Sequence, residues 1–260
     1  MTGAPAEFVR LAHQLADAAG AVQRRYFRTP VAVDTKADES PVTIADRESE
    51  AAMRDLIGRH CPTHGILGEE HGAADLDAEW VWVLDPIDGT KSFITGRPLF
   101  GTLIALLHDG VPVVGIIDQA IIGERWVGVA GEPSTHNGKP IHVRPCSRIA
   151  DAVLFVTSPR MFSTSSQLTA FQRVEREVRL PMFGGDCYAY GLMAMGFADL
   201  VVEASLAPYD YMALVPVVQG AGGMLTDWQG GTLTLGSDGR VIAAGDPRVH
   251  AEAMALLDLA

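Results

Sequence analysis

One stretch constrains the fold of this chain more than any other: residues 80–90, which read WVWVLDPIDGT. Its first five residues form an apolar run of the length expected for a buried strand. The run ends at an acidic turn in this interpretation, because Pro86 excludes the helical conformation at the residue before it and Gly89 permits a positive φ. We therefore expect Asp85 and Asp88 to lie close together at the end of a strand.

Two carboxylates held at one point repel each other, and a bound hard cation that accepts oxygen ligands relieves this repulsion. The carbonyl oxygen of Ile87, between the two aspartates, is a further candidate ligand. Gly89 and Thr90 then begin a short helix, where N–H groups without helical partners bind phosphate. The alternative is an Asx-type turn with solvated acids, and a motif this short does not distinguish the two.

The charge balance narrows the class of ligand. The chain has 32 acidic residues against 20 Lys plus Arg, which gives a net charge of −12, and no basic run interrupts this balance. Nucleic acid is therefore not an expected partner. An acidic protein that binds phosphate needs metal ions to reverse the local field, which again points to the aspartates.

The remaining composition predicts one cytoplasmic, soluble protein. At 260 residues and 48% hydrophobic content, the chain is long enough for one substantial core. The three cysteines are scattered, which argues against a disulfide framework or a zinc site. The sequence has no targeting pattern, and no apolar run approaches the length of a membrane span, so we expect no membrane partner.

The first half of the chain combines two helices with a sheet. Apolar residues at three- and four-residue steps predict helices over 5–27 and 44–60, the second capped by Thr43 or Ser40. The dipeptide DG at 109–110 predicts a hairpin. Strands are predicted over 31–35, 65–68, 80–84, 99–107, 111–118, 124–130 and 141–144. We expect one sheet, with one face covered by the two helices.

The second half alternates strands with helices. Its predicted strands cover 152–157, 180–183, 200–203, 224–226 and 241–244, and its predicted helices cover 167–178, 186–197, 211–220 and 247–257. No linker is long enough to separate domains, so we expect a single domain over 1–260. A soft seam near 145–150 divides an N-terminal α+β half from a C-terminal α/β half.

Other acids also stand where ligands gather. Glu69 and Glu70 follow the strand over 65–68, and open sheets bind ligands at the carboxyl ends of their strands. Asp46 lies in the first turn of a predicted helix, and Asp210 lies at the start of another. Each has a purely structural alternative as well: a solvated loop for the Glu pair, the helix dipole for Asp46 and an N-cap for Asp210.

Three separated motifs, in this order, resemble those of the inositol-monophosphatase superfamily. They are GEE at 68–70, WVLDPIDGTKSF at 82–93, and YD followed by GAGG within 209–223. The similarity spans nearly the whole chain. It implies a layered α/β/α/β/α fold and a magnesium-dependent, lithium-sensitive phosphatase that acts on a small phosphorylated metabolite.

The resemblance also implies how the acids bind Mg²⁺. Glu69, Asp85 and the Ile87 carbonyl would hold one ion, while Asp85, Asp88 and Asp210 would hold a second. Two or three ions are expected in each active site. Glu69 is accordingly counted among the catalytic residues as well as the ligands. These oxygen donors are the ligands that Mg²⁺ prefers.

The remaining roles follow from the same resemblance. Glu70 would lie nearby and act through water. Asp46 matches the aspartate that pairs with the motif threonine, here Thr90, to orient the attacking water, so no covalent phosphoenzyme forms. Asp88 and the N–H groups of Gly89 and Thr90 would bind the phosphate.

A phosphatase of the haloacid-dehalogenase type is a different class with a similar motif. Its D-x-D-G-T sequence places the two aspartates two positions apart, and the first of them is a nucleophile near the N-terminus. Here Asp85 and Asp88 are three positions apart and follow two predicted helices. We therefore exclude this class.

Two departures from the inositol phosphatases resemble the histidinol-phosphate phosphatases of the same superfamily. The chain reads GDCYAYG at 185–191, and it has Tyr209 where Trp usually precedes the aspartate. That subgroup converts L-histidinol phosphate and water to L-histidinol and phosphate in histidine biosynthesis. The alternative is an inositol-1-monophosphatase or a broad sugar-phosphate monophosphatase.

The substrate's ammonium and imidazole call for carboxylates, which Asp186 and Glu203 can supply beside Asp210. Asp186 has an N-cap as its structural alternative, and Tyr188 and Tyr190 are more typical of a core than of a substrate site. A non-catalytic protein that binds metal or phosphate is a further alternative, but it predicts a missing ligand, and none is missing. The resemblance also implies a homodimer in which one subunit supplies a loop to the partner's site.

Overall fold

The computed structural model describes residues 4–35 and 41–258. Its helices are α1 (Ala6–Tyr26), α2 (Ile44–His60), α3 (Thr90–Ile94), α4 (Ser165–Glu177), α5 (Asp186–Ala194), α6 (Pro208–Tyr211), α7 (Leu214–Gly220) and α8 (Pro247–Leu257). Short 3-10 helices cover Ile149–Asp151 and Pro159–Met161. No helix of these residues combines the length and the apolar character needed to cross a membrane.

The first sheet has eight strands. In chain order they are β3 (Gly65–Gly68), β4 (Gly72–Ala74), β5 (Trp80–Asp88), β6 (Gly101–His108), β7 (Val111–Gln119), β8 (Glu124–Val129), β9 (Thr135–His136) and β10 (Lys139–Pro140). They are arranged in the order β10-β9-β8-β7-β6-β5-β3-β4, and β3 and β5 are the parallel pair. A separate pair joins β1 (Val33–Thr35) to β2 (Pro41–Thr43).

The second sheet has five strands. They are β11 (Val153–Val156), β12 (Leu180–Phe183), β13 (Leu200–Glu203), β14 (Met224–Asp227) and β15 (Val241–Ala244). Their order is β12-β11-β13-β15-β14, with β11, β12 and β13 mutually parallel and β15 antiparallel to both of its neighbours.

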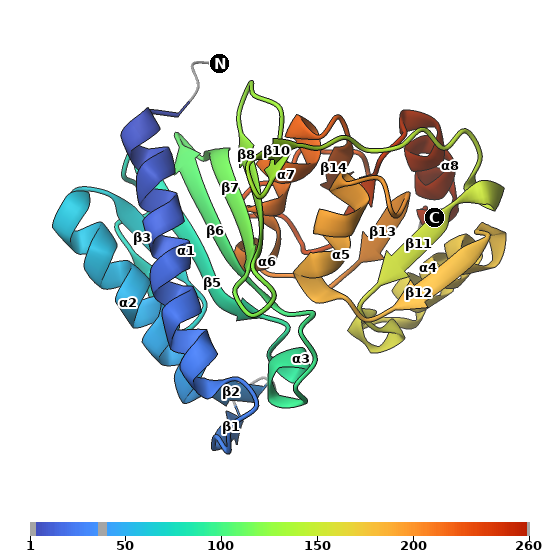
Figure 1. Ribbon diagram of the computed structural model, residues 1–260. Coiled ribbons are helices and arrows are strands. Elements are labelled where there is room, and N and C mark those ends of the chain that lie inside the picture. The colour runs from blue at the N-terminus through green and yellow to red at the C-terminus, as the bar shows by residue number, and fades with distance from the viewer. Residues whose placement is uncertain (1–3, 36–40, 259–260) are drawn as a thin grey trace.

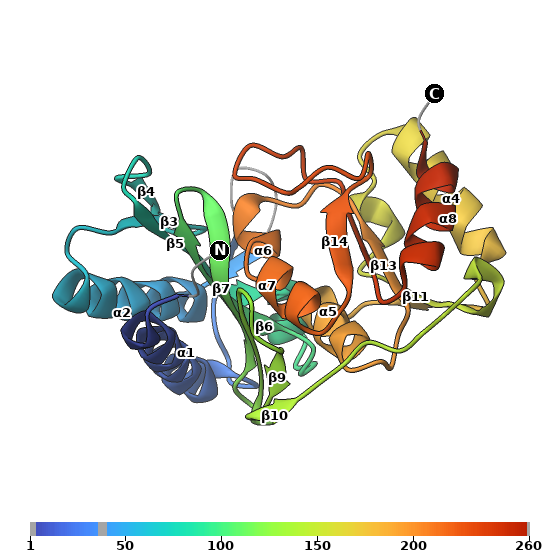
Figure 2. The ribbon, with the colours of Figure 1, turned by 90° about the horizontal axis from the view of Figure 1, so that it is seen from above.

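Helices and sheets alternate in five layers (Figures 1 and 2). Helices α1 and α2 cover the outer face of the first sheet, α5, α6 and α7 lie between the sheets, and α4 and α8 cover the second sheet. The apolar stripe of α1, including Leu11 and Leu15, packs with Met53 and Ile57 of α2 against Trp82 of β5. The predicted α/β/α/β/α layering is confirmed.

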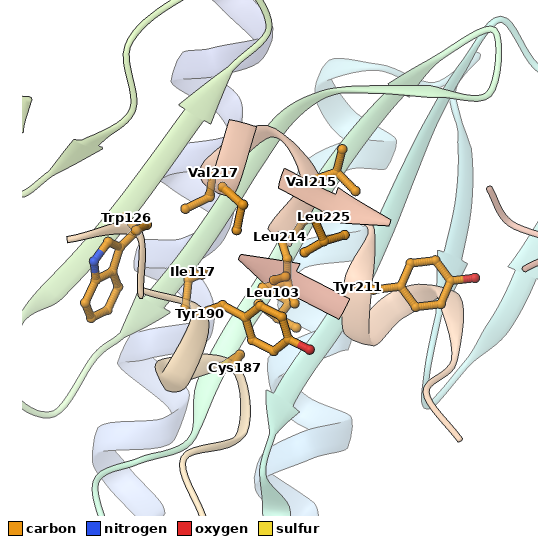
Figure 3. Packing of buried hydrophobic residues seen from close by; sticks show 14 of the residues in the cluster. Leu103, Ile117, Trp126, Cys187, Tyr190, Tyr211, Leu214, Val215, Val217 and Leu225 are labelled. Atoms are coloured by element: carbon orange, nitrogen blue, oxygen red, sulfur yellow. The ribbon is translucent and has the colours of Figure 1, made fainter. Parts of the chain in front are cut away.

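The central core fills the space between the sheets. Figure 3 shows Leu103, Ile117 and Trp126 of the first sheet facing Tyr190 of α5 and Val217 of α7. All five are buried, and burial of a Leu, Ile or Val side chain stabilises the fold by about 1.5–3 kcal/mol.

Two glycines let α7 lie directly on the first sheet. A Cβ atom on Gly115 would come within 2.0 Å of the carbonyl oxygen of Ala213, and one on Gly128 within 2.3 Å of the backbone of Pro216. Any other residue would displace α7, because these neighbours are backbone atoms that cannot turn aside. At these two points the contact between the first sheet and α7 is therefore made by main chain.

Strand β5 does not end at the predicted acidic turn. It continues to Asp88 through a β-bulge: Asp85 pairs with Leu103 and Asp88 with Gly101, with a register shift between them. A bulged residue needs no ladder partner, so the absent N–H of Pro86 is tolerated inside the strand. The bulge, and not a turn, brings the two aspartates together.

Other predicted elements are corrected by the structure. Residues 141–148 are not a strand; they cross to the second sheet as irregular chain (Figure 2). The predicted helix over 211–220 is two helices, because the nitrogen of Pro216 cannot donate to the carbonyl of Met212 four residues earlier. The strands β4, β9 and β10 were not expected, since two or three residues carry no readable period. Thr43 caps α2, and Ser40 lies outside the described residues.

Candidate active site

Three carboxylates converge between the two halves of the molecule. Asp85 and Asp88 come from the bulge of β5, and Asp210 comes from α6. One oxygen of each lies within 4.8 Å of the others, and Asp85 is only 2% exposed. This geometry can hold a metal ion.

Backbone N–H groups fix each of these carboxylates. Asp85 Oδ1 accepts from the N–H of Ile87 at 3.0 Å, and Asp88 Oδ2 accepts from Cys187 at 2.5 Å. Asp210 Oδ2 accepts from Ala207 at 2.7 Å. Ala207 is the N-cap of α6 and Asp210 is its third residue, so Asp210 satisfies the helix start without being the N-cap.

The surroundings favour a cation. Burial raises the pKa of Asp85 well above its usual value, and the charges of Glu69, Asp88 and Asp210 raise it further. Burial, with Asp186 and Asp210, does the same to the pKa of Asp88. The pKa of Asp210 rises to about 7, chiefly through burial. Buried oxygen donors that repel one another fit a hard divalent ion such as Mg²⁺.

Of the two glutamates predicted after β3, Glu69 lies beside this cluster. The charge of Glu69 acts on both Asp85 and Asp210, and its N–H donates to the carbonyl of Leu84 at 3.2 Å. The N–H of Glu70 donates to Glu50 Oε2 at 2.7 Å. Glu50 is a buried acid that the sequence did not single out, and it holds the loop that carries both residues.

Asp46 joins the start of α2 to the start of α3. Its Oδ2 accepts from the N–H of Thr43 at 2.9 Å and from the Thr43 hydroxyl at 2.6 Å. Its Oδ1 accepts from Thr90 Oγ1 at 3.2 Å, and Thr90 Oγ1 also lies 3.2 Å from the carbonyl oxygen of Ile87. Burial, first of all, raises the pKa of Asp46. Asp46 therefore completes a capping box with Thr43 at the start of α2 and also accepts a hydrogen bond from Thr90.

Asp186 approaches the start of α3 because Gly89 has no side chain. Gly89 adopts φ +84°, and a Cβ there would lie 2.7 Å from Asp186 Oδ2. Asp186 itself has φ +46°, a left-handed conformation rare for a residue other than glycine, and accepts from Ser92 Oγ at 2.7 Å. The N-cap of α5 is Gly185, so the alternative that Asp186 is the N-cap is wrong.

Glu203 is buried next to this group, and both its oxygens accept hydrogen bonds. Oε1 accepts from the N–H of Thr157 and Oε2 from the hydroxyl of Tyr190, both at 2.9 Å. Burial raises the pKa of Glu203 to about 7. Tyr190 is a core residue, as its structural alternative states, and Tyr188 donates its hydroxyl to Glu124.

A cavity of about 520 Å³ opens beside Asp186. It is lined by Lys91, Ser92, Thr95, Arg97, Thr157, Ser158, Arg160, Met161, Gly184 and Asp186. Asp186, whose charge raises the pKa of Asp88, connects this cavity with the carboxylate cluster.

The model of the inositol monophosphatase family matches residues 4–258. The chain belongs to this family. It is 48% identical to "Bifunctional phosphatase IMPL2, chloroplastic" of Arabidopsis thaliana, over 96% of this chain and 75% of the relative. It is 34% identical to a histidinol-phosphatase of Mycobacterium tuberculosis, over 95% and 96%. A solved inositol monophosphatase of Zymomonas mobilis superposes with a TM-score of 0.89 at 49% identity, over 96% and 97%.

Members of the inositol monophosphatase family hydrolyse phosphate monoesters, and this chain is such a phosphatase. The names of its relatives divide between histidinol and inositol phosphates, so family membership does not identify the alcohol. Sequence reasoning missed Ser92 and the N–H of Cys187 as partners of the site's acids. No local signal in the sequence joins them to Asp186 and Asp88.

Proposed function

We propose that this phosphatase is a Mg²⁺-dependent histidinol-phosphate phosphatase, which converts L-histidinol phosphate and water to L-histidinol and phosphate. The observation that supports this proposal most directly is that two further carboxylates, Asp186 and Glu203, lie beside the cluster of Asp85, Asp88 and Asp210. An alcohol that carries an ammonium group and an imidazole complements this excess of negative charge.

Five residues would hold the cations. They are Glu69, Asp85, Ile87 through its carbonyl, Asp88 and Asp210. When bound, Mg²⁺ supplies a Lewis acid that lowers the pKa of water and stabilises the departing oxygen. The oxygen donors and their buried, mutually repelling charges support this assignment.

The chain's own residues would position water and phosphate. The Thr90 hydroxyl, hydrogen-bonded to Asp46, holds the attacking water in line, and Asp46 takes up its proton through Thr90. The raised pKa of Asp46 suits a proton acceptor that works near neutral pH. The N–H groups of Gly89 and Thr90 at the start of α3 bind the phosphate oxygens.

A second candidate is an inositol or sugar phosphate. Lys91, Arg97 and Arg160 line the cavity next to Asp186, and three cationic side chains favour an uncharged, hydroxyl-rich alcohol over a cationic one. If the negative charge of Asp186 dominates the cavity, a cationic alcohol is favoured; if the positive charges of these three side chains dominate, an uncharged alcohol is favoured.

The deciding experiment compares kcat/KM for L-histidinol phosphate and for inositol 1-phosphate in Mg²⁺, in wild type and in Asp186→Asn. We expect wild type to prefer histidinol phosphate. A charged hydrogen bond contributes about 1.5–3 kcal/mol, so the variant should lose about 10- to 100-fold in kcat/KM for histidinol phosphate. Its activity on the inositol ester, whose alcohol part is uncharged, serves as the internal control and should change little. A wild-type preference for inositol 1-phosphate would overturn the proposal.

A further inference from the structure

The bulge of β5 leaves a gap in the first sheet. Asp85 pairs with Leu103 and Asp88 with Gly101, so Pro86 and Ile87 together stand opposite the single residue Thr102. Such a bulge interrupts the hydrogen-bond ladder, and a buried carbonyl group requires a partner. The carbonyl of Pro86 therefore needs a donor from outside the ladder.

Two side chains supply that donor. Gln23 of α1 is 0% exposed, and its Nε2 lies 2.8 Å from the carbonyl oxygen of Pro86 and 2.5 Å from Thr102 Oγ1. The hydroxyl of Thr102 donates to the same carbonyl oxygen at 3.0 Å. The three groups form a closed set of contacts centred on the bulge.

Gln23 reaches the bulge from the face opposite the carboxylates. Trp82 and Leu84 of β5 pack toward α1, whereas Val81 and Val83 pack into the core between the sheets. Side chains alternate along a strand, so Asp85 belongs to the second set. Helix α1 lies across the outer face of the sheet (Figure 1). The glutamine thus supports the site from behind without entering it.

Packing alone does not explain a glutamine here. Ala19 and Val22, its neighbours on the buried stripe of α1, are apolar. The Oε1 of Gln23 is buried and has no hydrogen-bond partner within residues 4–35 and 41–258. A buried, unsatisfied oxygen costs folding free energy that a methionine at the same position would avoid.

We propose that Gln23 is a positioning residue that, together with Thr102, fixes the bulge so that Asp85, Ile87 and Asp88 present their oxygens to the cation. The proposal rests on the cation site of the proposed function. Mg²⁺ demands near-ideal geometry at about 2 Å from each oxygen, so a small shift of the bulge weakens binding. Without its donors, the Pro86 carbonyl loses the contacts that hold this irregular register.

The test measures Mg²⁺ binding itself. Wild type and Gln23→Met are stripped with chelator, and MgCl₂ is titrated into each in a calorimeter. Loss of these contacts should raise the Mg²⁺ dissociation constant about tenfold or more. At saturating Mg²⁺, kcat should recover to near wild type and KM for the ester should be unchanged, because Gln23 touches neither substrate nor reacting atoms.

Gln119→Met is the matched control. Gln119 is also 0% exposed; it donates to the carbonyl of Phe100 at 3.2 Å and accepts from Ile121 at 2.8 Å and Ile122 at 3.0 Å. None of these partners belongs to the bulge. This variant should lose thermal stability while keeping the wild-type Mg²⁺ dissociation constant.

Thr102→Val provides a second, isosteric route to the same contacts if Gln23→Met does not fold. It should also weaken Mg²⁺ binding. The double variant should lose less Mg²⁺-binding free energy than the two single variants lose together, because both side chains act on one carbonyl. Dissociation constants within twofold of wild type in the folded variants would overturn the positioning role. Wild type that binds no Mg²⁺ would instead overturn the cation site, and the positioning role with it.

Discussion

Replacing Asp88 by Asn should change the stability of the protein in opposite directions with and without Mg²⁺. The substitution keeps the shape of the side chain, and its oxygen can still accept from the N–H of Cys187. It removes one negative charge from the cluster with Asp85 and Asp210. Without a cation that charge is repulsive, and with a cation it is a ligand.

The structure sets the magnitude. Two full charges at the 4.8 Å limit of the cluster repel by about 3 kcal/mol at an effective dielectric constant of about 20. The raised pKa values of Asp85 and Asp88 mean that proton uptake relieves part of this repulsion. We therefore expect Asp88→Asn to raise the free energy of unfolding of the metal-free protein by about 1–3 kcal/mol. For a chain of this size, that corresponds to a rise in Tm of about 2–6 °C.

Differential scanning calorimetry in EDTA and in excess MgCl₂ tests the expectation. Wild type should gain about 2.7 kcal/mol at one hundred times the Mg²⁺ dissociation constant, and the variant much less. Phosphate release by the variant should fall by several orders of magnitude. Asp199→Asn is the control. Asp199 is buried and paired with Arg144 at 2.7 Å, so loss of its charge should destabilise the metal-free and the Mg²⁺-bound protein equally. A lower Tm for Asp88→Asn in EDTA would refute the reasoning.

Two further outcomes are expected. Burial raises the pKa of Glu203 and of Asp210 to about 7, so the folded protein binds more protons than the unfolded chain between about pH 4 and pH 7. The contribution of these two protonated groups to stability in EDTA is therefore lost as the pH rises through this window. Glu203→Gln should flatten the dependence of Tm on pH. A curve of Tm against pH as steep as that of wild type would contradict this. Thr90→Val removes the hydroxyl that bonds Asp46 and should lower kcat about 100-fold or more without changing Mg²⁺ affinity in calorimetry. Thr232→Val, at an exposed threonine that does not line the cavity, is its control, and an equal loss of kcat in both variants would argue against a role for Thr90 in positioning water.

The parts of the site that are local in sequence were predictable. Two aspartates three positions apart predict a cation site, and the bulge that joins Asp85 to Asp88 lies within the same stretch. A proline inside a central strand argues against that strand, yet here the bulge makes it acceptable. The sequence therefore predicted correctly that Asp85 and Asp88 lie close together, but it predicted the wrong local structure for them.

The long-range parts were not predictable from the residues alone. Asp210 stood out only as a helix-start acid, and the family resemblance was needed to join it to the cluster. Asp186 meets Ser92 across 94 positions, and Glu203 meets Thr157 across 46, so no local pattern links either pair. The polar Gln23 stands out on the buried apolar stripe of α1, so the sequence could have indicated a special role for it. No sequence pattern predicts that its partner is the carbonyl of Pro86.

The glycines at positions 115 and 128 have a consequence for how the carboxylates stay in register. Asp85 and Asp88 belong to the first sheet, while Asp210 belongs to the segment that leads into α7. At Gly115 and Gly128 the main chain of the sheet contacts the main chain at the start of α7, and no side-chain rotamer can adjust there. Covalent geometry therefore sets the spacing between the first sheet and α7. The distance across the carboxylate cluster is therefore insensitive to substitutions that repack side chains elsewhere in the core.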